Sequence, residues 1–194
     1  MKIAIVKYNA GNVESVKNAL NRLDIEPILT DDAETLKNAD KVIFPGVGEA
    51  STAMNYLREK RLDEVIKSLK QPVLGICLGM QLLCKFSEEN STKCLNILPY
   101  NVRKFVSDNL KVPQIGWNNI SNLKGKIFNG ISENSYVYFV HSFYVESGEN
   151  TTATTDYGLH FSAAVEHKNF NATQFHPEKS GEVGAKILEN FLKI

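Results

Sequence analysis

The chain contains 194 residues, 43% of them apolar, and its 22 lysines and arginines are balanced by 22 aspartates and glutamates. The resulting net charge of zero argues against nucleic acid and anionic membrane surfaces as partners, because both favour a basic excess. No apolar run approaches the ~20 residues that a membrane-spanning helix needs, so we expect a cytoplasmic protein whose residues 1–194 form one domain with a sizeable core.

The first half of the sequence alternates apolar runs with amphipathic segments. Strands are predicted at residues 2–8, 26–30, 41–44 and 73–76, and helices at residues 13–23, 33–37, 49–58 and 62–69. The first strand begins at once, without the pattern of a signal peptide. Asn12 is a candidate cap for the first helix, and Pro45-Gly46-Val47-Gly48 is expected to stop the third strand after Phe44. This alternation predicts a parallel sheet covered on both faces.

The second half is richer in strands. They are predicted at residues 101–106, 115–120, 136–145, 151–156, 162–166 and 170–175. Many are bounded by Gly, Asn and Ser, which favours antiparallel pairing through hairpins. Residues 181–194 are predicted to form a final helix with an apolar core face. We therefore expect an α/β fold, a three-layer α/β/α sandwich with a mostly parallel central sheet and an added antiparallel portion.

A cysteine between two glycines follows the strand predicted at residues 73–76. Gly75-Ile76-Cys77-Leu78-Gly79 has the Gly-x-Cys-x-Gly pattern of a nucleophile elbow, a strained strand-to-helix turn that exposes its central side chain. Glycines are expected at 75 and 79 because strand and helix must pass each other closely. The first turn of the helix would also stabilise a thiolate at Cys77. A lone cysteine more often fills a core, so this motif needs support from elsewhere.

That support comes from Phe175-His176-Pro177-Glu178 near the C-terminus. Proline favours extended geometry in the residue before it, so His176 should end a strand. In an extended segment, side chains two residues apart point the same way, which would place Glu178 beside the imidazole. A nucleophile, a base and an orienting carboxylate are the parts of a covalent acyl-transfer site, whatever their order in the chain. Alone, this tripeptide could be a surface turn; together with the elbow it indicates an active site.

The remaining cysteines and histidines show no metal-binding pattern. The three cysteines, at positions 77, 84 and 94, include no Cys-x-x-Cys pair, so they match neither a disulfide framework nor a zinc ribbon. Cys84 is expected in the core, and Cys94, His160 and His167 lack ligand spacing. We therefore expect no metal and no cofactor.

The elbow and the His-Pro-Glu segment resemble those of class I (triad) glutamine amidotransferases. Within that family, further motifs resemble the glutaminase subunits of imidazole glycerol phosphate synthases: Tyr8-Asn9-Ala10-Gly11-Asn12, Pro45-Gly46-Val47-Gly48, Ile115-Gly116-Trp117-Asn118 and Tyr138-Phe139-Val140-His141-Ser142. The resemblance spans essentially the whole chain. It implies hydrolysis of L-glutamine to glutamate and ammonia. The ammonia would pass to a cyclase subunit, a (β/α)8 barrel of histidine biosynthesis, that forms imidazole glycerol phosphate and aminoimidazole carboxamide ribotide.

The resemblance also implies a role for each part of the site. Cys77 would be the nucleophile, His176 the general acid and base, and Glu178 the carboxylate that orients the imidazole. The oxyanion would be held by the Leu78 N–H and by a second N–H from the glycine loop, at Val47 or Gly48. Without the resemblance, that loop would be interpreted as a simple turn.

Substrate contacts are implied at five positions. Gln81 lies one helical turn after Cys77 and would bind glutamine, and Glu89 would hold its α-amino group. Gly46, Ser142 and Phe143 complete the implied set. A solvated acidic run remains an alternative for Glu89. His141 is expected to be structural, since His176 already supplies the base.

The implied contact with the cyclase, and the ammonia path beside it, involve Asn12, Trp117, Tyr138 and Lys179. For Lys179, an ordinary solvated lysine is an equal alternative. Gln114 departs from the family, which often has His there, and this leaves contact details near Trp117 open.

Other functions stay open at this point. A paralogous synthase of another pathway could use the same glutaminase chemistry. A stand-alone cysteine hydrolase and a catalytically silent binding subunit are two further alternatives. If the chain is a regulated subunit, we expect it to be nearly inactive alone, with a peptide flip near Val47 as the switch.

Overall fold

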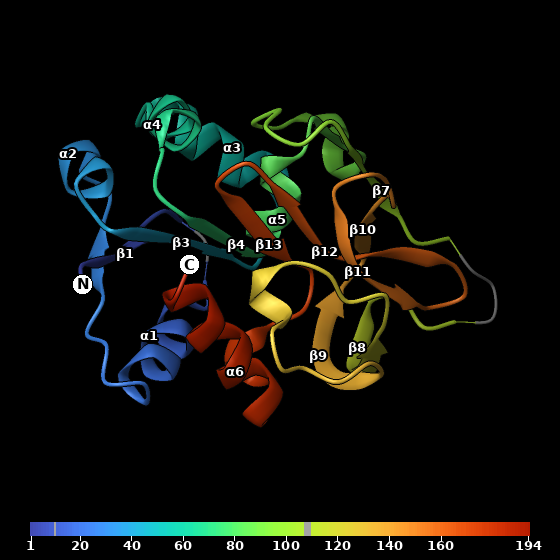
Figure 1. Cartoon of the computed structure of the whole chain (residues 1–194). Coiled ribbons are helices and arrows are strands. Elements are labelled where there is room, and N and C mark those ends of the chain that lie inside the picture. Colours follow the sequence, from blue (N-terminus) through green and yellow to red (C-terminus); the bar gives the residue numbers. More distant parts are fainter. Residues whose placement is uncertain (10, 107–109) are drawn as a thin grey trace.

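The centre of the molecule is a mixed sheet, seen in a computed structural model that describes residues 1–9, 11–106 and 110–194 (Figure 1). Five of its strands run parallel in the order β2-β1-β3-β4-β13. They are β1 (Ile3–Val6), β2 (Ile28–Thr30), β3 (Lys41–Gly46), β4 (Val73–Cys77) and β13 (Phe170–Thr173). Every residue of β1, β3, β4 and β13 is buried, as in a parallel sheet covered on both faces.

A largely antiparallel portion extends the sheet beyond β13 in the order β12-β10-β7-β5-β6, with β11 paired to β12. These strands are β5 (Phe86–Ser87), β6 (Thr92–Lys93), β7 (Asn101–Lys104), β10 (Phe143–Val145), β11 (Thr151–Asp156) and β12 (His160–His167). The pair β5–β7 is parallel and the other pairs are antiparallel. A separate antiparallel pair consists of β8 (Gln114–Ile120) and β9 (Ser135–His141).

Helices cover both faces of the parallel strands (Figure 1). One face carries α2 (Ala33–Lys37), α3 (Ala50–Glu59), α4 (Leu62–Ser68) and α5 (Leu78–Leu83); the other carries α1 (Val13–Asn21), α6 (Gly181–Leu192) and the β8–β9 pair. Short 3₁₀ turns are η1 (Glu89–Ser91), η2 (Lys126–Phe128) and η3 (Pro177–Lys179). A separate hydrophobic cluster lies on each face. The predicted three-layer sandwich is confirmed. No helix among the described residues has the length and apolarity to cross a membrane.

Most predicted elements are present, and where the bounds of a strand differ from the prediction, the pairing of that strand explains the difference. The third strand does not stop at Phe44, because Pro45 and Gly46 continue in parallel register with Ile76 and Cys77. The single strand predicted at residues 136–145 is interrupted at Ser142, since β9 pairs with β8 while β10 pairs with β7. The two-residue strands β5 and β6 were not predicted, because two residues are too few to show a period.

The parallel register determines where the site forms. Gly46 lies beside Cys77 and Thr173 beside Ile76, so β3, β4 and β13 end at the same edge of the sheet. In sheets of this kind, ligands bind beyond the carboxyl ends of the strands. The predicted glycine loop, elbow and His-Pro-Glu segment all leave the sheet at this edge.

Candidate active site

Cys77 occupies a strained turn between β4 and α5. Its φ of 52° and ψ of −107° lie in a region that non-glycine residues rarely adopt. A Cβ on Gly79 would lie 1.8 Å from the Phe44 carbonyl oxygen, and one on Gly75 would lie 3.0 Å from Leu83. The predicted close passage of strand and helix is therefore confirmed, and it excludes a side chain at Gly79 and leaves little room for one at Gly75.

His176 and Glu178 form a buried pair next to this turn. Nδ1 of His176 lies 2.7 Å from Oε1 of Glu178, and neither side chain is exposed. A carboxylate accepts, so Nδ1–H donates to Glu178. Nε2 is buried and has no hydrogen bond in the described part of the chain. The His176 main chain is held by the Tyr138 carbonyl, which accepts its N–H at 2.9 Å, and by the Ser180 hydroxyl, which donates to its carbonyl at 2.6 Å.

The path from His176 to Glu178 differs from the predicted one. His176 is extended, as expected, with φ −99° and ψ 94°. The strand, however, ends at Thr173, and residues 177–179 form the 3₁₀ turn η3, closed by a 3.0 Å bond from the Lys179 N–H to the His176 carbonyl. The expectation of an extended segment through Glu178 was wrong. Proline is favoured at the first position of a helical turn, and this turn, rather than strand alternation, brings the carboxylate back to the imidazole.

Opposing effects set the charge of the two histidines. Burial alone would lower the pKa of His176, but the negative charge of Cys77 and the Glu178 carboxylate outweigh it and raise the pKa to about 10. Burial lowers the pKa of His141 to about 4, although its bond to the Phe143 carbonyl opposes this shift. His176 is therefore suited to carry a proton beside a thiolate, whereas His141 remains neutral.

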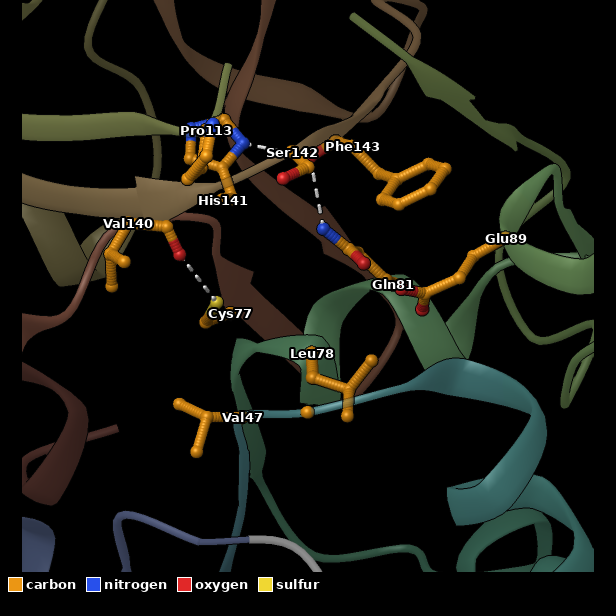
Figure 2. Close-up of a pocket in the computed structure, with 11 residues that line it drawn as sticks. Val47, Cys77, Leu78, Gln81, Glu89, Pro113, Val140, His141, Ser142 and Phe143 are labelled. Atoms are coloured by element: carbon orange, nitrogen blue, oxygen red, sulfur yellow. Dashed lines mark hydrogen bonds between the residues drawn. The ribbon is translucent and has the colours of Figure 1, made fainter. Parts of the chain in front are cut away.

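The elbow opens into a cavity of about 270 Å³ (Figure 2). Its lining residues are Val47, Gly48, Cys77, Leu78, Gln81, Glu89, Pro113, Val140, His141, Ser142 and Phe143. Val47 and Leu78 lie on one side of Cys77, and Val140 and Ser142 on the other (Figure 2). The structure thus brings together the predicted nucleophile, the predicted oxyanion positions and most of the predicted substrate contacts.

Gly46 is the predicted contact that the structure does not place in the cavity wall. It ends β3 beside Cys77, and a Cβ there would lie 2.1 Å from the Tyr8 hydroxyl oxygen. That hydroxyl is buried and donates to the Pro45 carbonyl at 2.6 Å. Burial, and secondarily the charge of Cys77, raise the pKa of Tyr8 well above its usual value, so it stays a donor. Gly46 is thus required for packing of Tyr8 under the glycine loop.

The two neighbouring glutamates, Glu88 and Glu89, have different environments. Glu88 is exposed and pairs with Arg103 at 2.8 Å. Glu89 is half-buried, lines the cavity and accepts a 2.6 Å bond from the Ala50 N–H through Oε2. Burial raises the pKa of Glu89, and the Ala50 bond opposes that shift. The solvated-run interpretation therefore fits Glu88, while Glu89 carries a carboxylate to the cavity.

Asn12 does not cap the first helix. Its φ of 73° is left-handed, whereas a capping residue needs extended geometry, and its side chain makes no cap hydrogen bond. Its amide nitrogen instead donates to Oε1 of Glu178 and lies 3.3 Å from Nδ1 of His176. The helix-cap prediction was wrong, and Asn12 instead contacts the buried His–Glu pair.

The other residues predicted for a partner surface lie close to the same pair. Trp117 is 56% exposed, and its ring centroid is 6.1 Å from that of Tyr138, whose carbonyl accepts the His176 N–H. Lys179 is exposed directly after Glu178. Gln114 is buried opposite His141 in the β8–β9 ladder, and its Oε1 has no partner among the described residues.

Gln174 is a site residue that sequence reasoning missed. It is fully buried, contacts Gln81 at 3.0 Å and lies 3.7 Å from the Cys77 sulfur through its amide nitrogen. The available signal was a polar side chain in the predicted strand at residues 170–175. The packing of Tyr8 under the glycine loop and the positions of Pro113 and Val140 in the cavity wall were likewise not predicted. Across residues 1–9, 11–106 and 110–194, no three His, Cys, Asp or Glu side chains gather as a metal-binding group.

Comparison with known proteins gives concordant results. The family Glutamine amidotransferase class-I matches residues 5–194. The chain is 57% identical to the imidazole glycerol phosphate synthase subunit HisH of Bacteroides fragilis (strain YCH46), over 100% of both chains. It is 45% identical to the subunit of that name from Haemophilus influenzae, over 100% of this chain and 98% of the relative.

Solved structures of low sequence identity share the fold. A crystal structure of a glutamine amidotransferase superposes with a TM-score of 0.75 at 21% identity, covering 98% of this chain and 97% of that one. A glutamine amidotransferase from Thermotoga maritima gives 0.68 at 17% identity, covering 100% and 83%.

Proposed function

The chain belongs to the glutamine amidotransferase class-I family, and we propose that it is the glutaminase subunit of an imidazole glycerol phosphate synthase. In this role residues 1–194 act as one cytoplasmic glutaminase domain. They hydrolyse L-glutamine and pass the ammonia to a cyclase subunit, which forms imidazole glycerol phosphate and aminoimidazole carboxamide ribotide for histidine biosynthesis. The observation that carries the chemistry is the buried His176–Glu178 pair, whose imidazole interacts with Cys77 in the cavity wall.

The reaction follows from the atoms at the elbow. The Cys77 thiolate attacks the side-chain amide carbon of glutamine, and the carbonyl oxygen becomes an oxyanion. His176, protonated at Nε2, gives its proton to the departing ammonia, leaving a thioester. Water, deprotonated by the now neutral His176, attacks that thioester, releases glutamate and returns the thiolate and the imidazolium. Glu178 holds Nδ1–H throughout and stabilises the imidazolium.

The oxyanion needs donors on the cavity side of Cys77. The Leu78 N–H follows the nucleophile at the start of α5, and Val47 and Gly48 line the cavity beside it. We assign the second donor to the Val47 or Gly48 N–H. Loss of one such donor costs about 10²–10³ in turnover.

The opposite wall suits an amino acid with a free α-amino and α-carboxyl group. Glu89 offers a carboxylate for the α-ammonium, and Ser142 and Phe143 line the same cavity. Gln81 is 4% exposed and fixed by its bond to the Phe143 carbonyl, so it presents a rigid edge to the glutamine side chain. These groups select a small zwitterion with an amide tail.

The partner surface is proposed on the side of the buried pair that carries Asn12, Trp117, Tyr138 and Lys179. Trp117 and Ile115 expose apolar surface on β8, with 56% and 63% of their area accessible. Exposed apolar side chains that gather in this way mark interaction sites. The cyclase would complete a heterodimer here and receive ammonia from the site beside the buried pair.

Full-length identity to HisH subunits favours this assignment over a stand-alone cysteine hydrolase. The test is ammonia release from glutamine, measured for the chain alone and with a cyclase subunit and its acceptor substrate. We expect hydrolysis that depends on the cyclase and is lost in Cys77→Ala. Equal hydrolysis with and without every cyclase tested would identify an independent hydrolase instead.

A further inference from the structure

A chain of side-chain amides runs beneath the cavity and ends at the nucleophile. It begins at the Phe143 main-chain carbonyl, which accepts from Nε2 of Gln81 at 3.0 Å. The same nitrogen lies 3.0 Å from Oε1 of Gln174, and Nε2 of Gln174 lies 3.7 Å from the Cys77 sulfur. Gln174 and Cys77 are 97 residues apart in sequence, so this contact is purely tertiary.

The orientation of both amides follows from the first acceptor. A carbonyl oxygen can only accept, so the group of Gln81 that faces Phe143 must be its NH₂. The second hydrogen of this NH₂ then faces Gln174, which must present its oxygen. The NH₂ of Gln174 is thereby directed at the sulfur. If Gln81 were reversed, its oxygen would face two other oxygens at 3.0 Å, and if Gln174 were reversed, two NH₂ groups would face each other at that distance.

Burial makes this donor effective. Gln174 is 0% exposed and Gln81 is 4% exposed. The Gln174 main chain is also held, since its N–H donates to the Ala163 carbonyl at 2.8 Å. A fixed N–H in a site shielded from water interacts with an anion more strongly than a mobile one in solvent.

We propose that Gln174 is a positioning residue for the nucleophile: its amide N–H donates to Cys77, holds the sulfur at the cavity floor and stabilises its thiolate form. Its part in turnover rests on the proposed glutaminase function, in which sulfur is anionic before attack and again when the thioester breaks. Gln174 therefore assists both half-reactions. Because the amide of Gln81 orients the amide of Gln174, the position of Gln81 in the cavity wall also affects the position of the Cys77 sulfur.

Several titratable groups also surround Cys77. His176, backed by Glu178, faces it from the segment after β13; the Tyr8 hydroxyl lies near it from the end of β1; and His141 shares its cavity from β9. The Val140 carbonyl accepts from the thiol at 3.8 Å. Gln174 does not titrate. Its removal should therefore displace the pH profile of thiolate reactivity without adding or removing a titration step.

The test is the rate of Cys77 alkylation by iodoacetamide across pH in the isolated full-length chain, followed on the Cys77 peptide by mass spectrometry. Gln174→Leu removes the donor at similar volume. We expect the midpoint of its rate profile to move up by about one pH unit, with about tenfold slower alkylation below the midpoint. Gln81→Met keeps Gln174 but releases its orientation, and should give a smaller shift in the same direction.

A matched control is Asn190→Leu in α6. It removes another buried amide, whose nitrogen donates to the Ile127 and Asn129 carbonyls at 3.0 and 2.7 Å. This variant should lose stability and leave the alkylation profile unchanged. The proposal is overturned if folded Gln174→Leu, or folded Gln81→Met where the former does not fold, reproduces the wild-type profile. Alkylation requires no glutamine, so absence of glutaminase activity in the complex with the cyclase and its acceptor substrate would refute the proposed function and leave this inference intact.

Discussion

The two walls that meet at Cys77 are built in different ways. On the elbow side, Gly75 and Gly79 are packed against neighbouring backbone and side chains, and His176 and Glu178 are fully buried. On the glycine-loop side, a Cβ on Gly48 would meet nothing within 4 Å, and its φ of 114° is accessible mainly to glycine. The elbow side is therefore a fixed wall, held by packing, whereas the glycine-loop side is an adjustable wall, with room for its backbone to move.

Space exists on both sides of that loop. Besides the active-site cavity, a second cavity of about 270 Å³ lies behind it, lined by Asn9, Val47, Gly48, Glu49, Thr52, Ala53 and Leu78. A peptide of the loop can therefore rotate without displacing the core. The groups proposed to make and break bonds are thus held by packing, whereas the loop at residues 47–48, where we propose the second oxyanion donor, has room to move. Control by a partner is expected to act there.

The largest expected effect comes from the fixed wall. Cys77→Ala should reduce glutamine hydrolysis by at least ~10⁴-fold, because no other group at the elbow can form the thioester. Ammonia-dependent synthesis by the cyclase should stay nearly intact, since that chemistry lies on another chain. Both rates are measured in the assembled enzyme. Glutamine hydrolysis near the wild-type rate would remove Cys77 from the mechanism.

In the same wall, substitutions of the base and of its orienting carboxylate should lower turnover by different amounts. His176→Ala should abolish nearly all turnover at saturating glutamine. Glu178→Gln should cost less, because the carboxylate acts through the imidazole and a neutral amide can still occupy its place. If Glu178→Gln were the more damaging substitution, the assigned roles would be wrong.

Because the glycine-loop wall has room to move, we predict that the partner activates glutamine hydrolysis. If the productive form of the loop makes up about 1% of the isolated chain, a bound cyclase with its acceptor needs a few kcal/mol of preference for that form to make it dominant. The kcat for glutamine hydrolysis should then rise about 10²-fold from the chain alone to the fully liganded complex. Three measurements suffice: chain alone, with cyclase, and with cyclase and acceptor. Equal values in all three states would contradict a switch.

The smallest effects are expected on the free energy of unfolding, and they should differ between the two walls. Gly79→Ala puts a methyl group against the Phe44 carbonyl, at 1.8 Å before relaxation. We expect it to lower the free energy of unfolding by about 3 kcal/mol. Gly48→Ala meets open space and carries only backbone strain, of about 1–2 kcal/mol. Denaturant unfolding compares them directly, and a Gly48→Ala variant less stable than Gly79→Ala would reverse our description of the two walls.

The sequence by itself determined the features that depend on neighbours along the chain. Short apolar runs alternating with amphipathic segments predicted the layered sheet, because a strand buried on both faces is apolar throughout and a helix covering it is apolar on one side. The elbow was predictable because Gly75, Cys77 and Gly79 lie within one turn. The pairing of His176 with Glu178 was predictable for the same reason, although the turn that achieves it was not.

Tertiary structure alone decided which distant groups meet. Asn12 reached Glu178 instead of capping α1, Glu89 rather than Glu88 reached the cavity, and Gln174 came to lie against the sulfur. Each outcome depends on strand register and on the packing of elements remote in sequence. A local pattern records which residues are buried. It does not record which hydrogen-bond partner a buried polar group finds, because that partner is supplied by another part of the chain.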